Sequence, residues 1–400
     1  MKNVAILGFG VVGGGVARLL TDNRVECEAL GGDSINIKYI LDLRDFPDSP
    51  FADRIVHDFG IIENDGEIDT VIEVLGGSHP AYEFTVASLR AGKNVITSNK
   101  EVVATFGDEF LALAEERGVS YRFEAAVGGG IPVISPLIGF IGQNKIHEVR
   151  GILNGTTNYI LTKMFTLGES FEAALAQAQA KGYAEKNPDA DVLGTDTARK
   201  IAILAAIATG KLVSTESFCT EGITNVTHDD VARAEALGYK IKLLARCVVC
   251  DGEPKITVAP YMIPIDEMLS GVSGVFNAVE VLGQPIGKAV FYGPGAGAGP
   301  TASAVVGDLV QIMRSGRQVK NPEFTKKAGG VSSFSEIESR FYVSLEGACP
   351  LDAERAFGGV HKPSGVGGCE IVTRAMTRAE CERIAAELGA VIKGAIRILD

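Results

Sequence analysis

The stretch VAILGFGVVGGGVARLL, residues 4–20, constrains the fold of this 400-residue chain more than any other segment. An apolar, β-branched run predicts a strand. After it, Gly8, Gly10 and Gly13 follow the G-x-G-x-x-G spacing, and an amphipathic helix comes next. The first glycine permits a tight turn, the second lets backbone approach a pyrophosphate, and the third lets the helix pack on the strand. Free N–H groups at the helix start would attract phosphates. We therefore expect a dinucleotide site at Gly8, Gly10, Val11, Val12 and Gly13.

Strands and helices continue to alternate as far as residue 130. IDTVIEVLGG, NVITSNK and VSYRFEAAVGGG are expected to be strands with their ends, and HPAYEFTVASLRAG and EFLALAEERG helices. This order predicts a parallel, doubly wound (Rossmann) sheet with ligands at the carboxyl ends of its strands. Gly76, Ser98 and Lys100 fall at such ends. We expect them to face a cofactor, and we favour a functional Lys100 over a plain surface cation.

The second strand, INIKYILDL, leads into Asp42 and Arg44. An acid at this place favours the ribose 2′-OH of NAD, whereas an arginine favours the 2′-phosphate of NADP. Both residues are present, so the choice between the cofactors stays open. The spacing from the glycines exceeds the usual ~20 residues, which indicates an insertion around GGDSIN.

The pattern changes after Gly130, where Ile131-Pro132 is expected to open a helix. HEVRGILNGTTNYILTKMF then predicts a strand, a turn and a helix. The hydroxyls of Thr156 and Thr157 would cap this helix, whose free N–H groups would face a ligand carboxylate. A helix cap that binds no ligand is an equally good interpretation of these residues.

The segment GYAEKNPDADVLGTDTARK, residues 182–200, is dense in charge and precedes the apolar run IAILAAIATG. Asp196 and Lys200 are four residues apart, so they share one helix face, and such a pair is usually a surface bridge. Here the following helix is apolar nearly all round, so the lysine should lie at the mouth of a buried helix. That is the setting of a catalytic or substrate-orienting lysine. Glu185 and Asp191 add acceptors for an ammonium group, which suits a small amino acid.

Composition excludes several partner classes. The formal net charge is −12, which on average repels nucleic acid and anionic membranes. No apolar segment approaches the ~20 residues that span a bilayer, so we expect a cytoplasmic protein. The seven cysteines are scattered, and the CxxC of Cys247 and Cys250 lies in a strand-like run, so we favour buried strand cysteines over a metal or redox site.

Seven ordered segments together resemble the homoserine dehydrogenase family. They are GFGVVGGGV, EVLGG, NVITSNK, EAAVGGGIP, GILNGTTNYILTKM, GYAEKNPDADVLGTDTARK and GPGAGAGPTASAV, spread over roughly the first 310 residues. The resemblance implies reversible oxidation of L-homoserine to L-aspartate 4-semialdehyde with NAD or NADP, in the route to threonine, methionine and isoleucine. It also implies a homodimer or higher homo-oligomer.

The resemblance implies a role for each matching residue. Lys200 would be the proton acceptor, with Lys100 and Asp196 beside the reaction. The substrate would be held by Glu185, Asp191, Gly155, Thr156 and Tyr183. The cofactor would contact Gly8, Gly10, Val11, Val12, Gly13, Asp42, Arg44, Gly76, Ser98, Lys100 and Gly295. A monovalent cation, sodium or potassium, would be wrapped by Glu124, Val127, Gly129 and Ile131, mostly through backbone carbonyls.

The expected fold class is α/β, with three domains. Residues 1–130, completed by about 298–320, would form the dinucleotide-binding domain, and residues 131–297 an α+β substrate and dimerisation domain. Residues 336–400 would form a short βαββαβ module similar to the ACT domain of many family members. ACPLDAERAF stands where the family has an acidic Pro-Gly turn, so the module is expected to serve assembly rather than inhibitor binding.

Two other functions stay open. A nicotinamide-sensing regulator would explain the glycines but not the acid–lysine segment. Another dehydrogenase, acting on a different amino or hydroxy acid, would explain both, because only the family motifs argue for homoserine.

Overall fold

The computed structural model describes residues 1–315, 318–319, 323–326 and 338–399. The chain divides into two compact units. Unit 1 is formed by residues 1–146, 202–213 and 293–327, and unit 2 by residues 147–201, 214–292 and 328–400. These divisions fall at other places than the three expected domains, whose bounds stay a prediction.

Unit 1 contains a six-stranded sheet in the order β3-β2-β1-β4-β5-β6, in which every neighbouring pair is parallel. Its strands are β1 (Lys2–Leu7), β2 (Ile35–Leu41), β3 (Ile55–Val56), β4 (Ile68–Glu73), β5 (Asn94–Thr97) and β6 (Tyr121–Arg122). The chain reverses its direction of travel across the sheet between β3 and β4, on either side of β1. This confirms the doubly wound sheet and places its switch point beside the glycine turn that follows β1.

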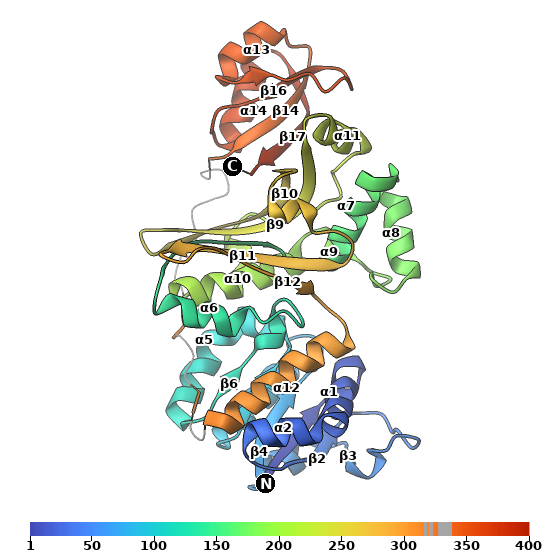
Figure 1. The fold of residues 1–400 in the computed structure, drawn as a ribbon, viewed down its shortest axis with the longest axis vertical. Coiled ribbons are helices and arrows are strands. Elements are labelled where there is room, and N and C mark those ends of the chain that lie inside the picture. Colours follow the sequence, from blue (N-terminus) through green and yellow to red (C-terminus); the bar gives the residue numbers. More distant parts are fainter. Residues whose placement is uncertain (316–317, 320–322, 327–337, 400) are drawn as a thin grey trace. The chain divides into compact units, whose positions relative to one another are not determined.

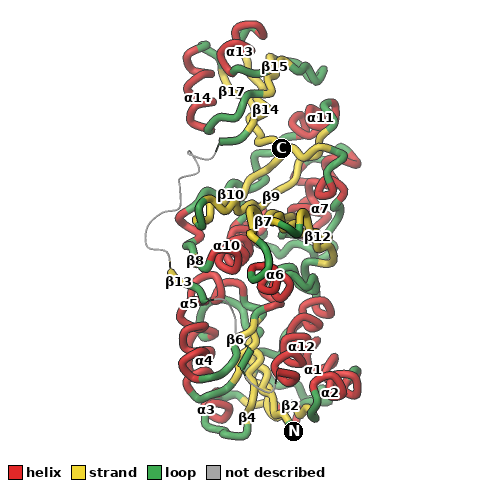
Figure 2. Tube along the Cα trace, turned by 60° about the vertical axis from the view of Figure 1, so that its left-hand side comes forward, coloured by secondary structure: helices red, strands yellow, loops and turns green. Residues whose placement is uncertain are grey.

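Helices cover both faces of this sheet (Figures 1 and 2). One face carries α1 (Val11–Asp22), α2 (Arg24–Gly31) and α12 (Ala298–Ser315), and the other α3 (Phe59–Glu63), α4 (Ala81–Arg90) and α5 (Lys100–Arg117). Residues of β1, α1 and α12, among them Ile6, Val16 and Leu309, form one buried apolar cluster. Helix α12 therefore completes the core of the unit from a distant part of the sequence.

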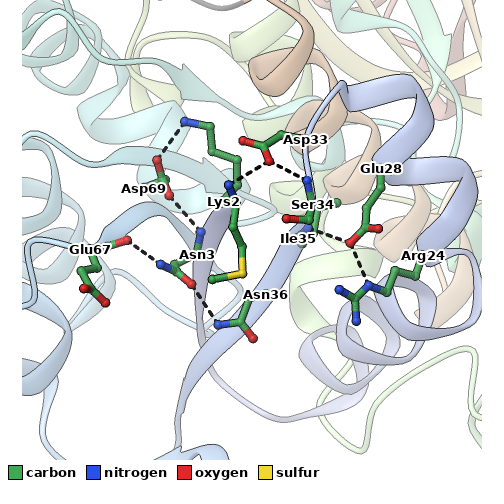
Figure 3. A network of polar contacts seen from close by, with 11 residues as sticks. Lys2, Asn3, Arg24, Glu28, Asp33, Ser34, Ile35, Asn36, Glu67 and Asp69 are labelled. Atoms are coloured by element: carbon green, nitrogen blue, oxygen red, sulfur yellow. Dashed lines mark hydrogen bonds and ion pairs between the residues drawn. The ribbon is translucent and has the colours of Figure 1, made fainter.

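Polar side chains tie together the amino ends of β1, β2 and β4 (Figure 3). The Asp69 carboxylate accepts hydrogen bonds from the backbone N–H of Asn3 and from Lys2 Nζ, both at 2.9 Å. Asn36 donates to the side-chain oxygen of Asn3, also at 2.9 Å. These contacts fix the strands at the edge opposite their carboxyl ends.

At the carboxyl edge, Asp42 links the end of β2 to the glycine turn. Its carboxylate accepts hydrogen bonds from the backbone N–H of Phe9 at 2.8 Å and from Arg44 Nε at 3.0 Å. The hydrogen bond from Arg44 is the largest of the influences that lower the pKa of Asp42 to about 2. The Asp42 side chain is 10% exposed, so this interaction is only partly screened by water.

Unit 2 is built on a mixed nine-stranded sheet in the order β12-β11-β7-β9-β10-β17-β14-β16-β15. The first five strands are β7 (Lys145–Ile152), β9 (Tyr239–Cys250), β10 (Glu253–Pro264), β11 (Phe276–Gln284) and β12 (Gly287–Pro294). Helices α7 (Gly155–Leu167), α8 (Phe171–Ala180), α9 (Asp189–Val192), α10 (Thr195–Thr209) and α11 (His228–Ala236) come from the same part of the chain. Cys247 is buried and Cys250 half-buried in β9, as expected of strand cysteines.

The C-terminal residues form the expected βαββαβ order. The elements are β14 (Arg340–Glu346), α13 (Pro350–Phe357), β15 (Val360–His361), β16 (Cys369–Val372), α14 (Arg378–Glu387) and β17 (Val391–Ile398). Strand β17 pairs in parallel with β10, through Tyr261 with Arg397 and Met262 with Ile398. The module therefore continues the sheet of unit 2 instead of forming a separate one.

Three local expectations differ from the structure. The strand expected within 119–130 is short: β6 is followed by a 3₁₀ turn, η2 (Glu124–Ala126), and then by two left-handed glycines, Gly128 and Gly129. The helix expected at Ile131-Pro132 begins at Ile134 as α6 (Ile134–Ile141). The long spacing between the glycines and Asp42 is filled by the extra helix α2.

The contact of Gly13 with the glycine turn gives a stability prediction. A Cβ at Gly13 would lie 1.9 Å from the Gly8 carbonyl oxygen, whereas one at Gly14 meets nothing within 4 Å. We expect Gly13→Ala to destabilise unit 1 by about 3 kcal/mol through overpacking. Gly14→Ala, the matched control in the same helix turn, should be neutral or stabilising by about 0.5–1 kcal/mol. Thermal unfolding of both variants checks this, and equal midpoints would contradict it.

Asp42 gives a prediction of pH dependence. Because its pKa is lower in the folded chain than the ordinary 3.8, the ionised carboxylate stabilises the fold above that pH. The stabilisation, about 2 kcal/mol, is lost as the pH falls toward 2. Asp42→Asn should therefore lower the free energy of unfolding at pH 7, and its difference from the wild type should shrink between pH 4 and 2.

Urea unfolding at a series of pH values measures that difference. Asp48→Asn, at an exposed position on the same loop, serves as the control and should match the wild type throughout. A deficit of Asp42→Asn that stays constant from pH 7 to 2 would contradict the assignment.

Candidate active site and cofactor site

The glycine turn leaves the start of α1 open to a ligand. Gly8 has a φ of +99°, which favours glycine, and α1 begins at Val11 after Gly10, which makes no side-chain cap. Val11, the first residue of the helix, is 75% exposed, whereas Gly13 in the same turn is buried. The N–H groups there have the arrangement that binds a pyrophosphate.

A cavity of about 390 Å³ lies beside the turn in unit 1. Its lining combines apolar residues with Gly8, Asp42, Arg44 and His57. The Arg44 guanidinium pairs with Asp42 and lies 5.0 Å from the Phe46 ring centroid, yet its side chain is 65% exposed. A mostly apolar pocket lined in part by an exposed arginine suits a nucleoside that carries a phosphate.

The loops after β4 and β5 hold the other expected cofactor residues of unit 1. Gly76 is exposed, and Ser98 and Lys100 are half-buried. Lys100 is the first residue of α5, whose N-cap Asn99 accepts hydrogen bonds from the backbone N–H groups of Glu101 and Val102. These residues thus lie at the carboxyl edge of the sheet, as the strand pattern predicts.

The segment expected to wrap a cation is also in unit 1. The Glu124 carboxylate accepts hydrogen bonds from the backbone N–H groups of Val133, Ile134 and Ser135, each at 2.8 Å, and from the Ser135 hydroxyl. Because its two oxygens already hold the start of α6, Glu124 is not positioned as a side-chain ligand. Among the described residues, no cluster of His, Cys, Asp and Glu side chains forms a metal site.

The backbone after Glu124 still fits a monovalent cation. In the described part of the chain, no hydrogen bond is donated to the carbonyl oxygens of Val127, Gly129 or Ile131. A Cβ at Gly129 would lie 2.6 Å from the backbone of Gly295, so this turn requires glycine and close packing. Carbonyl oxygens without hydrogen bonds are ordinary ligands for a hard cation.

Unit 2 holds a buried ion pair at the start of α10. Lys200 Nζ donates hydrogen bonds to Asp196 Oδ2 and to the Leu153 carbonyl oxygen, both at 2.7 Å. The side chains of Lys200 and Asp196 are 10% and 6% exposed. The shared helix face is therefore confirmed, and the pair is not a surface bridge.

Asn154 organises this pair, and the sequence reasoning missed it. Its amide nitrogen donates to Asp191 Oδ1 at 2.7 Å and to Asp196 Oδ2 at 2.9 Å. Its oxygen accepts from the Thr157 N–H at 2.8 Å, which caps α7. The Asn residue before GTT was the available signal, since asparagine is a preferred N-cap.

The hydroxyls of Thr156 and Thr157 therefore do not cap α7, contrary to expectation. Thr156 Oγ1 instead donates to the Tyr183 carbonyl oxygen at 2.7 Å, and Thr157 Oγ1 to the carbonyl oxygen of Asn154 at 3.2 Å. The position of Asn154 explains this, because its side-chain oxygen already accepts the hydrogen bond from Thr157 N–H, the third N–H of the helix.

Asp191 is the second carboxylate of the cluster. Burial is the main cause that raises its pKa, and the nearby Asp196 carboxylate raises it further. A carboxylate in this setting gains most from an ammonium group placed against it.

The remaining expected substrate residues, Gly155, Tyr183 and Glu185, have different surroundings. Gly155 is required, because a Cβ there would lie 2.7 Å from the Val275 carbonyl oxygen. The Tyr183 ring packs edge-on against Tyr159, with centroids 5.2 Å apart. Glu185 is exposed, and among the described residues no hydrogen bond joins its side chain to Asp191 or Asp196.

Comparison with known proteins places the chain in a family. Residues 8–124 match the family model "Homoserine dehydrogenase, NAD binding domain", and residues 132–310 match the model "Homoserine dehydrogenase". The chain is 42% identical over 313 residues to a homoserine dehydrogenase of Pseudomonas aeruginosa, covering 78% of this chain and 72% of that protein. It is 39% identical over 355 residues to that of Bacillus subtilis, covering 86% and 80%.

Solved structures agree with this. The structure of a homoserine dehydrogenase from Thiobacillus denitrificans has a TM-score of 0.90 at 33% identity, covering 100% of this chain and 98% of that one. A hyperthermophilic archaeal homoserine dehydrogenase in complex with NADPH has a TM-score of 0.68 at 26% identity, covering 80% of this chain and all of the other.

No described helix is long and apolar enough to cross a membrane. The matches set aside the sensing regulator and the dehydrogenase of another substrate. The chain belongs to the homoserine dehydrogenase family, as an NAD(P)-dependent oxidoreductase with homoserine dehydrogenase activity in the biosynthesis of the aspartate-family amino acids.

Proposed function

We propose that Lys200 accepts the hydroxyl proton of L-homoserine while the carbinol carbon loses a hydride. The observation that carries this is the buried pair of Lys200 with Asp196, completed by the Leu153 carbonyl oxygen. Hydride leaves an alcohol carbon readily only as the hydroxyl proton departs, so a base must touch that oxygen. The nicotinamide, when bound, takes up the hydride.

Asp196 has a supporting part in this step. To accept the proton, Lys200 must start as the neutral amine. On taking it, Lys200 becomes the ammonium ion that is paired with Asp196 in the structure, in a site nearly closed to water. The Asp196 carboxylate and the Leu153 carbonyl oxygen, each 2.7 Å from Lys200 Nζ, stabilise that charge. In the reverse direction the same ammonium returns its proton to the oxygen of the aldehyde. Lys100 is proposed as the second lysine at this oxygen.

The ends of the amino acid are proposed to bind at the start of α7. Asp191, half-buried and held by Asn154, suits the substrate ammonium group. Glu185 and the backbone of Tyr183 lie on the loop before α9 and are proposed to complete this side. The N–H groups of Gly155 and Thr156, in the first turn of α7, suit the substrate carboxylate.

We propose NADP as the preferred cofactor. The Asp42 carboxylate already accepts hydrogen bonds from Phe9 and Arg44, which leaves it poorly suited to a ribose 2′-OH. The Arg44 guanidinium is exposed at the rim of the cavity, where it suits a 2′-phosphate. The archaeal neighbour bound to NADPH is consistent with this choice.

A sodium or potassium ion is proposed at the carbonyl oxygens of Val127, Gly129 and Ile131. Such an ion would be coordinated by carbonyl oxygens that accept no hydrogen bond from the described residues, in a turn with two left-handed glycines. Glu124 would support the site indirectly by holding α6 in place. A homo-oligomer and a cytoplasmic location, both expected from the sequence, stay predictions.

The role of Lys200 predicts a large loss of turnover on substitution. Lys200→Ala should lower kcat for L-homoserine by about 10²- to 10⁴-fold, because the proton acceptor is removed. Lys186→Ala, at an exposed lysine on the preceding loop, is the matched control and should keep wild-type rates. Initial rates of NADPH formation measure both, with circular dichroism to verify folding. A folded Lys200→Ala protein with wild-type kcat would refute the role.

The role of Arg44 predicts a change in cofactor selectivity. Arg44→Ala should raise the KM for NADP by about 10- to 100-fold and leave the KM for NAD within about threefold, since only the phosphate contact is lost. Arg24→Ala, at an exposed arginine on α2, controls for a general loss of positive charge. If both cofactors weaken equally, Arg44 does not read the 2′-phosphate.

A further inference from the structure

Glu73 is a fully buried carboxylate at the carboxyl end of β4, and the proposed function does not use it. It is 0% exposed. Its Oε1 accepts a hydrogen bond from the Leu75 backbone N–H at 2.7 Å, and its Oε2 accepts one from Thr97 Oγ1 at 2.5 Å. Among the described residues, no lysine, arginine or histidine forms an ion pair with it.

The second contact extends into the loop after β5. Thr97 Oγ1 accepts a hydrogen bond from the Asn99 backbone N–H at 2.9 Å. Asn99 in turn donates from its side chain to the Gly77 carbonyl oxygen at 2.7 Å and accepts from the Glu101 N–H at 3.1 Å. The chain of hydrogen bonds thus runs from Glu73 to the start of α5.

These contacts join two loops at the cofactor edge of the sheet. Residues 74–77 follow β4, and residues 98–100 follow β5. The first loop also lies against the glycine turn, since a Cβ at Gly8 would be 3.1 Å from Leu75 Cδ2. Gly76 and Lys100, both expected at the cofactor, are carried by the two loops.

The strands themselves do not depend on this network. Glu73 and Thr97 are opposite each other in the parallel ladder of β4 and β5, and the Ser98 N–H bonds to the Glu73 carbonyl oxygen at 3.3 Å. Backbone hydrogen bonds therefore hold the sheet. What the side chains add is the orientation of the loops beyond it.

A carboxylate is needed here because both side-chain oxygens act as acceptors. An ionised carboxylate accepts at two oxygens, whereas an amide of the same shape has one acceptor oxygen and an NH₂ group that only donates. Burial raises the pKa of Glu73 to about 7, against the opposing effect of its three hydrogen-bonding neighbours Thr97, Leu75 and Asn99. A buried acid without a counter-ion is costly, which points to a role beyond packing.

We propose that Glu73 is a positioning residue: through Thr97 and Asn99 it holds the loops after β4 and β5 in the arrangement that binds the cofactor and places Lys100. The claim that Glu73 helps to place Lys100 rests on the proposed function. The claim that it affects cofactor binding rests only on the cofactor site of unit 1. Glu73 itself touches neither substrate nor cofactor in this account.

Thr97 offers a matched pair of variants for the test. Thr97→Val keeps the size of the side chain and removes the hydroxyl that links Glu73 to Asn99. Thr97→Ser keeps the hydroxyl and removes a methyl group. We expect Thr97→Val to weaken NADPH binding and to lower kcat, each by about 10- to 100-fold, because a charge-assisted link is lost. Thr97→Ser should stay within about threefold of the wild type in both.

The KM for L-homoserine separates positioning from general damage. It should stay within about threefold in Thr97→Val, since the Asp191 and Asp196 cluster belongs to unit 2. NADPH dissociation constants come from nicotinamide fluorescence without substrate, and thermal midpoints verify that each variant is folded. The cofactor titration does not need turnover, so it tests the inference even if the wild type fails to oxidise homoserine.

Two results would overturn the proposal. One is a folded Thr97→Val protein with wild-type NADPH affinity and kcat. The other is an equal loss in Thr97→Ser and Thr97→Val, which would assign the effect to packing. If Thr97→Val does not fold, Glu73→Gln takes its place, because its amide cannot accept at both positions. Glu73→Gln should then show the same loss of both NADPH affinity and kcat. Wild-type NADPH affinity and kcat in this variant would refute the role of Glu73.

Discussion

The buried ion pair between Asp196 and Lys200 is the constraint on which the substrate site depends. Charges removed from water must be fully hydrogen-bonded, and removing one partner of a buried pair typically costs about 3–5 kcal/mol. The Leu153 carbonyl oxygen and the Asn154 amide meet this requirement, and both come from the junction between β7 and α7. The pair therefore fixes that junction against the first turn of α10, and the same contacts bring Asp191 and the open N–H groups of α7 to one place.

Helix starts are used in two different ways. The N-caps of α5, α6 and α7 are served by carboxylate or amide groups, namely Asn99, Glu124 and Asn154, which also hold neighbouring loops or side chains. Helix α1 starts from Gly10, which makes no side-chain cap. Orphan N–H groups at a helix start need an acceptor, and at the glycine turn no side-chain cap supplies one.

Much of this arrangement could be predicted from the sequence. The glycine spacing predicts the close contact of Gly13 with Gly8, and the i, i+4 spacing before an apolar run predicts the buried pair of α10. The rest depends on contacts between distant residues. Asn154 reaches Asp196 across 42 positions and Glu73 reaches Thr97 across 24, and no local pattern reports such pairings. The strand expected within residues 119–130 is present but short, because apolar composition does not reveal where a 3₁₀ turn replaces the strand. Glu185, expected as an acceptor for the substrate ammonium group from its position in a charged segment, is exposed in the structure, and its role stays a prediction.

Chemical rescue of Lys200→Ala is the measurement that decides whether Lys200 is the proton acceptor. If Lys200 is the proton acceptor, the cavity left by its side chain should admit a small amine that accepts the proton in its place. Ethylamine should raise the rate of L-homoserine oxidation by Lys200→Ala in proportion to the concentration of free amine, and should leave the wild-type rate unchanged. A Lys200→Ala protein that oxidises homoserine at the wild-type rate, with or without ethylamine, would contradict the account and show that the proton leaves by another group.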